Sequence, residues 1–427
     1  MRVCVIGLGY IGLPTALLLS QKNDVVGVDL KKSVVEKVND RIMPFEEPGL
    51  EDLLKRSGMV ASTAPQRADA FIICVPTPFD KEVRMADLRY VKAAAESIAP
   101  VLEKGNLVVV ESTVSPGACE KVVAPILEKS GLKARKDFFL AHCPERAIPG
   151  NTLHEMVHND RILGGVDETS TRLALELYST FVKGNIYTTD AATAEFVKLM
   201  ENTYRDINIA MANEFAIIAE DAGVNVWEAI SLANRHPRVN ILKPGPGVGG
   251  HCIAVDPWFL TENSTKCKII NTAREINDCM PSYVLGKVKE AVRRIESPKI
   301  TVFGVAYKGN VDDARETPAL KFIRLAEKEG YIVSVYDPLV KKFEYPLTGL
   351  DEAVADTDCI VIISDHDQFK TMDYDWILSH ARHRNVVDTR NIVTPGRTFR
   401  LITLGKSDEG AFDTEGTEGT EGTEVKV

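Results

Sequence analysis

The sequence is short of the features that mark several large classes of protein. Its eight cysteines are scattered and include no C-x-x-C pair, which argues against a zinc knuckle or a thioredoxin-like redox motif. It has no run of about 18 apolar residues, the length that would predict a membrane span. Acidic residues outnumber basic ones by 61 to 51, whereas proteins that coat nucleic acids or anionic membranes need a positive field. We therefore expect neither nucleic acid nor a membrane as a partner.

The two ends of the chain bear on its location and its order. Residues 1–14 enter a strand-like run with no separate charged region and no cleavage site, so we expect a cytoplasmic protein. Residues 407–427 repeat Thr-Glu-Gly without an apolar anchor, which predicts a disordered acidic tail. This tail has one basic and seven acidic residues, which leaves only −4 of the net charge of −10 for residues 1–406.

Apolar runs alternate with helix-like stretches in two separate regions. The first region extends from residue 2 to about residue 141, and the second begins near Lys299. Such alternation predicts parallel sheets with both faces covered by helices. Residues 191–222 lie between the regions, contain no Pro or Gly and have apolar residues at helical spacing, which predicts one long helix ending near Gly223.

These patterns predict an α/β protein with two doubly wound, Rossmann-like domains joined by a long central helix and a helical middle domain. The expected boundaries are 1–187 for the first domain, 188–296 for the middle, 297–406 for the second doubly wound domain and 407–427 for the tail.

The glycine-rich segment at residues 7–12 predicts a dinucleotide site. It reads G-x-G-x-x-G, follows a strand-like run and opens a helix, and Asp29 ends the next strand. The glycines allow close approach to a pyrophosphate at a helix N-terminus. Because Asp29 would accept from ribose hydroxyls and repel a 2′-phosphate, the expected cofactor is NAD. The expected contacts are Gly7, Gly9, Tyr10, Ile11, Gly12 and Asp29.

Cys252 follows four glycines that lie within six residues, at 245–250. A cysteine beside such a loop can be held as a reactive thiolate, although a structural thiol in a glycine-rich turn stays open on these facts. In a dinucleotide enzyme, a thiol nucleophile is needed when an aldehyde is carried on to an acid, because the thiohemiacetal supplies the second hydride.

Lys198 and Asn202 are four residues apart on the predicted long helix and therefore face the same side. A Lys and an Asn side by side suit an oxyanion or hydroxyl ligand. The alternative is a solvated helix face.

At these residues the chain resembles the nucleotide-sugar 6-dehydrogenases, the family that oxidises UDP-glucose, GDP-mannose and UDP-N-acetylhexosamines. The resemblance covers residues 1 to about 404. Within the family, GGHC and the Val at 255, where a Lys usually precedes the Asp, favour the N-acetylhexosamine branch over the UDP-glucose branch, and residues 234–259 look most similar to enzymes acting on UDP-N-acetyl-D-mannosamine. The matching segments are GLGYIG at 7–12, VPTP at 75–78, ESTV at 111–114, PER at 144–146, KLMEN at 198–202, NIAMANE at 208–214, GGHCIAVDP at 249–257 and AYKGNVDDARETPA at 306–319.

The resemblance implies a catalytic set. Cys252 would be the nucleophile, Lys198 and Asn202 would stabilise oxyanions and orient the sugar, and Asp256 would assist proton transfer or hold the hydrolytic water. Glu145 and Thr113 would handle water, with Glu145 as the general base if burial raises its basicity. Further cofactor contacts would come from Thr77, Thr113 and Arg315.

The resemblance also implies a substrate set and a partner. Tyr307, Lys308 and Arg390 would contact the UDP half, and Arg238 would be donated across a homodimer interface into the neighbour's site. The full set of expected sugar-nucleotide contacts is Glu145, Arg146, Lys198, Asn202, Arg238, Gly249, His251, Tyr307, Lys308 and Arg390.

Several alternatives stay open at this point. The C2 epimer UDP-N-acetyl-D-glucosamine is the alternative substrate, and a non-catalytic protein that senses NAD or a nucleotide sugar is an alternative of another class. A simple hydroxyacid dehydrogenase would leave the second nucleotide-type domain without a ligand. His154 and His158, like His380 and His383, have metal-like spacing but no accompanying cysteine or carboxylate cluster, so the sequence predicts no metal.

Overall fold

The computed structural model describes residues 1–80, 85–148 and 150–407 and divides the chain into two compact units. The first unit comprises Met1–Thr203 and Val255–Cys267, and the second comprises Tyr204–Ala254 and Lys268–Val427. The predicted acidic tail, apart from Ser407, lies outside the described residues.

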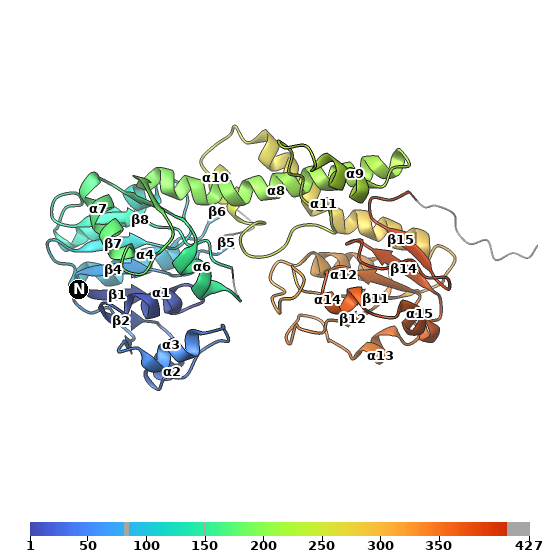
Figure 1. Cartoon of the computed structure of the whole chain (residues 1–427), viewed down its shortest axis with the longest axis horizontal. Helices are drawn as coiled ribbons and strands as arrows, with labels where there is room; N and C mark the ends of the chain where they lie inside the picture. Colours follow the sequence, from blue (N-terminus) through green and yellow to red (C-terminus); the bar gives the residue numbers. More distant parts are fainter. Residues whose placement is uncertain (81–84, 149, 408–427) are drawn as a thin grey trace, which may run out of the picture. The chain divides into compact units, whose positions relative to one another are not determined.

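The first unit is built on an eight-stranded sheet with the order β10-β9-β8-β7-β4-β1-β2-β3 (Figure 1). Six of these strands, in the order β8-β7-β4-β1-β2-β3, run parallel. This is the strand order of a dinucleotide-binding fold, with its switch point between β1 and β4. β8 and β9 are antiparallel, and β10 pairs parallel with β9. The strands are β1 (Arg2–Ile6), β2 (Asp24–Val28), β3 (Val60–Ser62), β4 (Ala70–Ile73), β7 (Leu107–Val110), β8 (Phe139–His142), β9 (Arg161–Gly165) and β10 (Ile186–Asp190).

Helices cover both faces of this sheet because its strands are apolar on both sides. Alternate residues of β1 point to opposite faces: Val3 and Val5 pack against α1, α3 and α7, whereas Cys4 and Ile6 pack against α4 and α5. The helices of the unit are α1 (Gly12–Leu19), α2 (Lys32–Asn39), α3 (Leu50–Arg56), α4 (Arg89–Ile98), α5 (Ala124–Leu127), α6 (Thr152–His158), α7 (Glu168–Tyr178) and α10 (Asp256–Thr261). A short hairpin of β5 (Phe79–Asp80) and β6 (Met85–Ala86) is also present.

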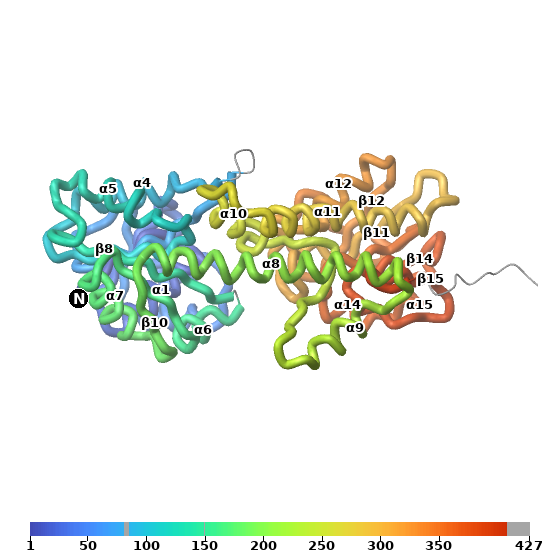
Figure 2. Tube along the Cα trace, turned by 90° about the horizontal axis from the view of Figure 1, so that it is seen from above, coloured from blue at the N-terminus to red at the C-terminus, as the bar shows by residue number. Residues whose placement is uncertain are grey.

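The predicted long helix is confirmed as α8 (Ala191–Asp221), 31 residues that Figure 2 shows as one unbroken helix. Its first 13 residues belong to the first unit and the rest to the second. The helix ends where Gly223 takes a left-handed conformation with φ of 69°, as expected for a glycine just past a C-terminus.

The second unit is built on a five-stranded parallel sheet with the order β12-β11-β13-β14-β15 (Figure 1). This is the other common doubly wound order, with its switch point between β11 and β13. The strands are β11 (Lys299–Phe303), β12 (Ile332–Tyr336), β13 (Cys359–Ile362), β14 (Asn385–Asp388) and β15 (Arg400–Thr403).

Helices also cover both faces of the second sheet. α11 (Lys268–Ala291) and α12 (Pro318–Lys328) pack on one face, and α13 (Leu350–Val354), α14 (Asp367–Lys370) and α15 (Tyr374–Ile377) pack on the other. α9 (Val226–Ala233) packs against the C-terminal half of α8. Together the two sheets and α8 confirm the predicted fold class.

Buried polar groups join α8 to α11 in the second unit. Arg274 donates to Asp206 at 2.5 Å, and their side chains are 2% and 0% exposed. Asn277 donates to the same carboxylate at 2.9 Å, and Asn213 donates to Asn277 at 2.9 Å. Among the described helices, none is both long enough and apolar enough to cross a membrane.

Removal of the Arg274 guanidinium should destabilise the second unit. Arg274→Ala would leave the Asp206 carboxylate buried without its cation, which typically costs about 3–5 kcal/mol. Urea unfolding followed by circular dichroism would measure this loss. The control is Arg324→Ala, because Arg324 pairs with Glu344 on the surface of the same unit. Equal unfolding midpoints for the two variants would contradict this account of the α8–α11 contact.

Candidate active site

The glycine loop after β1 in the first unit has the geometry of a pyrophosphate cradle. Gly7 has φ of 96°, and a Cβ there would lie 2.4 Å from the carbonyl oxygen of Cys74 after β4. A Cβ on Gly12 would lie 1.8 Å from the carbonyl oxygen of Gly7. A Cβ on Gly9 would meet no heavy atom within 4 Å, so this glycine faces open space, as the position nearest a phosphate should.

Asp29 lies at the carboxyl end of β2, beside this loop. Its carboxylate accepts from the Leu8 amide at 3.0 Å and from the Lys31 amide at 2.9 Å, which fixes its orientation. Tyr10 is half exposed with its ring 4.3 Å from that of Phe45, and Ile11 immediately precedes α1. The residues predicted for the cofactor's phosphates and ribose are thus brought together at one edge of the sheet.

The predictions for the nicotinamide end are divided between the units. Thr77 is buried after β4, and Thr113 is half buried after β7, so both follow strands next to the switch point. Arg315 belongs to the second unit, where its guanidinium donates to both carboxylate oxygens of Asp313.

Lys198 and Asn202 are buried, which rules out the solvated-face alternative. They are 8% and 7% exposed, and the Asn202 side-chain amide donates to Asp256 at 2.6 Å. Asp256 is the first residue of α10, and Phe259 of the same helix packs on Leu199 of α8. The Asp256 carboxylate and the Lys198 and Asn202 side chains therefore lie beside the same apolar cluster.

Burial raises the pKa of Asp256 to about 6, against the opposing effects of the Lys198 charge and the Asn202 hydrogen bond. The carboxyl therefore titrates close to physiological pH, which is the range expected of a general base or acid. A strongly shifted carboxyl beside a buried lysine is typical of active sites.

Glu145 is held more tightly than the sequence suggested. Its carboxylate accepts from the amides of Arg146 at 2.6 Å and Ala147 at 2.8 Å, and it forms a buried ion pair with Arg161. Arg146 in turn donates to Glu201 of α8 at 2.7 Å. Arg146 thereby links the loop after β8 to the helix that carries Lys198.

Two members of this buried network were not singled out from the sequence. Glu111 accepts from Thr15 at 2.9 Å, Cys74 at 2.9 Å and Tyr178 at 3.1 Å, and burial raises its pKa despite the nearby Arg161. Glu111 is the first residue of the ESTV segment and was therefore available as a signal. Arg161 begins a short strand with no motif around it, so nothing in the local sequence marked it.

Cys252 lies in the second unit and is itself exposed, within a turn at residues 251–255 whose other members are partly or fully buried. The glycines before it are needed because the loop packs directly on Tyr307: a Cβ on Gly249 would lie 3.0 Å from the Tyr307 Cβ, and one on Gly250 would lie 2.9 Å from the Tyr307 ring. The Gly250 amide donates to the Arg315 carbonyl at 3.0 Å. His251 is partly buried, and burial followed by the Arg315 charge lowers its pKa, so its ring is neutral at pH 7.

The residues predicted for the UDP half gather at the carboxyl edge of the second sheet. Tyr307 and the exposed Lys308 follow β11, and Arg390 follows β14. Arg390 donates to the carbonyl oxygen of Ile363 at 2.8 Å, and its guanidinium lies against Gly245 of the glycine-rich loop. Arg238 does not follow a strand of this sheet. It lies in an exposed segment after α9.

Three family models match the chain in succession. They are the NAD binding domain, the central domain and the UDP binding domain of the UDP-glucose/GDP-mannose dehydrogenase family, at residues 1–182, 192–279 and 301–395. The chain belongs to this family. The predicted family and the NAD cofactor are thereby confirmed, and the protein is a NAD-dependent nucleotide-sugar dehydrogenase.

Individual relatives are similar over almost their whole length. UDP-N-acetyl-D-mannosamine dehydrogenase of Methanocaldococcus jannaschii is 52% identical, over 95% of this chain and 96% of that protein. NDP-N-acetyl-D-galactosaminuronic acid dehydrogenase of Ralstonia solanacearum is 46% identical, over 91% and 96%. The solved structure of UDP-D-ManNAc dehydrogenase from Pyrococcus horikoshii is 43% identical and superposes with a TM-score of 0.90, over 96% of this chain and 100% of that one.

A methyl group on Gly250 should disable this family member without unfolding it. Gly250→Ala would place a Cβ against the Tyr307 ring at a φ of 83°, so we expect the loop that carries Cys252 to shift and kcat/KM to fall at least about tenfold. Initial rates of NADH formation at nucleotide-sugar concentrations well below KM would measure the effect.

Gly330→Ala is the matched control, since Gly330 has a φ of 81° and an added Cβ meets nothing within 4 Å. It imposes the same backbone strain of about 1–2 kcal/mol without the clash. Equal activities in the two variants would show that the contact with Tyr307 does not position the cysteine loop.

Proposed function

We propose that this family member oxidises the C6 hydroxyl of UDP-N-acetyl-D-mannosamine to the carboxylate of UDP-N-acetyl-D-mannosaminuronate, using two NAD. The carrying observation is the buried group of Lys198, Asn202 and Asp256, with the exposed Cys252 four residues before Asp256 in the chain. Because the reaction consumes NAD and a nucleotide sugar, the proposal places it in the cytoplasm.

The proposed reaction has three stages. The C6 alcohol first loses a hydride and a proton to become an aldehyde, and NAD serves as the hydride acceptor in both oxidations. The Cys252 sulfur then adds to the aldehyde carbon while a proton passes to the aldehyde oxygen. Loss of a second hydride and of the hydroxyl proton converts the thiohemiacetal into a thioester. Water finally attacks the thioester, which releases the carboxylate and returns the thiol.

Lys198 and Asn202 suit the charge that develops on the C6 oxygen. A buried ammonium and a buried amide can stabilise an alkoxide or a tetrahedral oxyanion more strongly than water can. They are already oriented, and their surroundings have a low dielectric constant. Their i, i+4 spacing on α8 fixes the distance between them.

We assign the general base for the hydrolytic step to Asp256 in preference to Glu145. The Asp256 carboxyl has a pKa of about 6, and Asn202 donates to one of its oxygens. The Glu145 carboxylate already accepts from two backbone amides and an arginine, so its oxygens are engaged by the protein rather than open to a water molecule. We therefore give Glu145 a role in shaping the loop and Thr113 a role as a hydroxyl ligand of the reactants.

The choice of sugar rests on the glycine loop and on the relatives. The GGHC segment with Val255 before Asp256 favours an N-acetylhexosamine, and the Methanocaldococcus jannaschii and Pyrococcus horikoshii relatives are named for the mannosamine substrate. The Ralstonia solanacearum relative is named for a galactosaminuronic acid, although its sequence identity to this chain is similar. Sequence identity at this level therefore does not by itself decide which sugar is bound. The alternative we keep is UDP-N-acetyl-D-glucosamine.

The remaining assignments belong to the same proposal. We assign residues 1–187 to the cofactor, 188–296 to the central helical domain and 297–406 to the UDP sugar. Tyr307, Lys308 and Arg390 would hold the UDP half, with Gly249 and His251 beside the sugar; an arginine fork suits a diphosphate.

A homodimer is proposed because α8 exposes an apolar stripe. Its six large side chains are 38% to 57% exposed, and large apolar side chains gathered on one helix face usually mark a protein interface. In that dimer Arg238, which is exposed in each chain, would enter the neighbour's site. The stripe consists of Phe196, Met200, Tyr204, Met211, Phe215 and Ile218.

Product stoichiometry tests the proposed reaction. We expect two NADH for each UDP-N-acetyl-D-mannosamine consumed, a faster rate than with the C2 epimer, and no turnover in Cys252→Ser because no thioester can form. Absorbance of NADH together with chromatography of the sugar nucleotides would measure this. One NADH with a released aldehyde, or a fully active Cys252→Ser, would refute the thioester route.

The pH dependence of turnover tests the assignment of Asp256. A base must be deprotonated, so kcat should fall about tenfold per pH unit as the pH drops below about 6. Asn202→Ala removes a hydrogen bond that favours the charged carboxylate, so in that variant the acid limb should move to higher pH. An acid limb that stays in place in Asn202→Ala would assign it to another group.

Subunit mixing tests the assignment of Arg238. Arg238→Ala and Cys252→Ser should each be inactive, yet a heterodimer of the two would contain one site with an intact Cys252 and a neighbour's intact Arg238. If folded subunits exchange at random between twofold symmetric dimers, half of the dimers become heterodimers, each with one active site. Mixing should then restore about a quarter of wild-type activity. No recovery in verified heterodimers would show that Arg238 does not act across the interface.

A further inference from the structure

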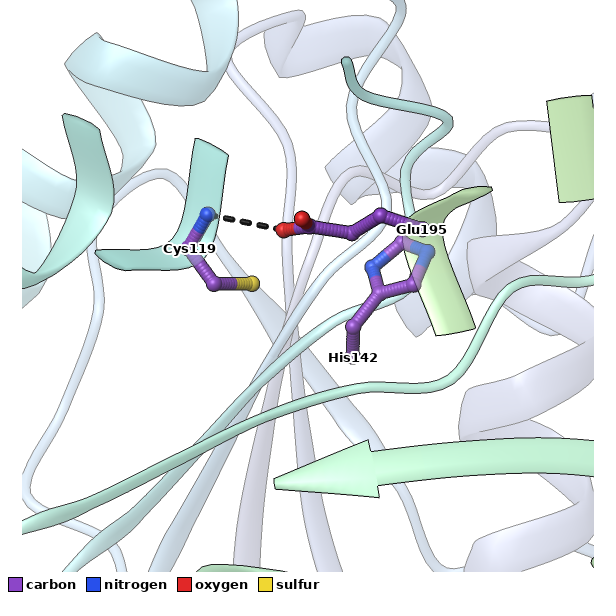
Figure 3. Close-up of side chains that lie close together, drawn as sticks. All are labelled: Cys119, His142 and Glu195. Atoms are coloured by element: carbon purple, nitrogen blue, oxygen red, sulfur yellow. Dashed lines mark hydrogen bonds between the residues drawn. The ribbon is translucent and has the colours of Figure 1, made fainter. Parts of the chain in front are cut away.

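Three side chains that the proposed reaction does not use come together behind the loop after β7. Cys119 begins the helical turn that precedes α5, His142 is the last residue of β8, and Glu195 lies on α8 one turn before Lys198. Figure 3 shows the thiol, the imidazole ring and the carboxylate converging on one another. Their ligand atoms all lie within 4.8 Å of each other, and all three residues are buried.

The imidazole of His142 has no proper hydrogen-bond partner in the described structure. Its ring is 0% exposed, and neither Nδ1 nor Nε2 forms a hydrogen bond with another described group. The backbone carbonyl of Val110 lies near the ring without adequate hydrogen-bond geometry. A buried ring nitrogen without a hydrogen-bond partner costs about 1–3 kcal/mol of folding free energy. A ligand bound to the ring would remove this cost.

The carboxylate of Glu195 is buried without a basic side chain in ion-pair distance among the residues described. It accepts from the backbone amides of Gly117 at 2.5 Å and Cys119 at 2.8 Å. It also accepts from the Cys119 thiol, which still leaves an acceptor position open, since an ionised carboxylate offers about four. A buried negative charge with spare acceptor capacity favours a cation beside it.

The size of the cluster fits a small divalent ion. A point equidistant from three atoms that are at most 4.8 Å apart lies at most about 2.8 Å from each, and zinc bonds to S, N and O are about 2.0–2.3 Å. The side chains would therefore need to move inward by at most about 0.5–0.8 Å. Thiolate, imidazole and carboxylate together are the ligand types of zinc rather than of calcium or magnesium.

We propose that Cys119, His142 and Glu195 form a buried binding site for a zinc-like divalent cation within the first unit. A neutral imidazole can donate a ring-nitrogen lone pair to a metal. The Cys119 thiol would lose its proton to solvent as the metal–sulfur bond forms.

Charge balance supports a structural role for this cation. One divalent ion, one thiolate, one carboxylate and a neutral imidazole sum to zero, so the bound site would be electrically neutral in the protein interior. The cation would tie together the segment after Thr113, the strand before Glu145 and the α8 turn before Lys198. It would stabilise those segments without contacting the reacting sugar.

Cobalt binding tests this site without relying on activity. In a Cys252→Ser background, which removes the exposed catalytic thiol, chelator-treated protein titrated with Co²⁺ should develop the near-ultraviolet absorbance of a thiolate–cobalt bond, and equimolar Zn²⁺ should abolish it. Cys119→Ala added to this background should eliminate the band, and His142→Asn should weaken binding at least about tenfold. Cys143→Ala is the matched control, because Cys143 is a buried thiol of the next residue along the chain from His142.

Thermal unfolding supplies a second readout if one variant folds poorly. Zn²⁺ should raise the melting temperature of the Cys252→Ser protein and of its Cys143→Ala derivative but not that of its Cys119→Ala derivative. Absence of the thiolate band in Cys252→Ser, or its persistence after Cys119→Ala, would overturn the proposal. In the first case an ordered water would be the ligand of His142.

Discussion

The first unit's share of the candidate site depends on one carboxylate, that of Asp256, being kept almost entirely out of water. An exposed aspartate would be fully ionised and weakly basic at neutral pH, whereas burial on α8 brings its pKa to about 6. The Lys198 charge and the Asn202 hydrogen bond favour the charged form and so oppose the effect of burial. Phe259 and Leu199 supply the apolar packing that makes this balance possible.

Each of the two sheets has an aspartate that holds a loop in place, but the two aspartates accept different numbers of hydrogen bonds. In each unit an aspartate ends the second strand and accepts from the loop that follows the first strand. Asp29 accepts from two backbone amides and is partly exposed, so it has acceptor capacity left for a ribose. Asp337 accepts from the amides of Val305, Ala306, Leu339 and Val340 and contacts His366 at 3.2 Å.

This difference decides what each edge can bind. Asp337 is buried, yet its hydrogen bonds with His366 and the amides bring its pKa down to about 2, so it remains an ionised loop anchor. With its acceptor capacity occupied, Asp337 is poorly suited to reading a ribose. In the proposed function, recognition at the second sheet is assigned instead to Tyr307, Lys308 and Arg390.

Local patterns in the sequence determined most of the framework. The alternation of apolar runs predicted both sheets, and the absence of Pro and Gly over 191–222 predicted α8, because helix length and breakers are properties of neighbouring residues. The short strands β3, β5, β6, β9, β10 and β15 were missed, since segments of two to five residues are too short to show an apolar pattern of their own. The family motifs named Cys252, Lys198, Asn202 and Asp256 as candidates.

Only the tertiary structure decided the environments of these groups. The i, i+4 spacing of Lys198 and Asn202 put them on one face of a helix, but their burial depends on α10, which lies more than 50 residues further along the chain. The pairing of Glu145 with Arg161 and the grouping of Cys119, His142 and Glu195 likewise join residues from separate strands and helices. Desolvation and charge proximity act through space, so the acid–base properties of a side chain follow from packing that its neighbours in sequence do not specify.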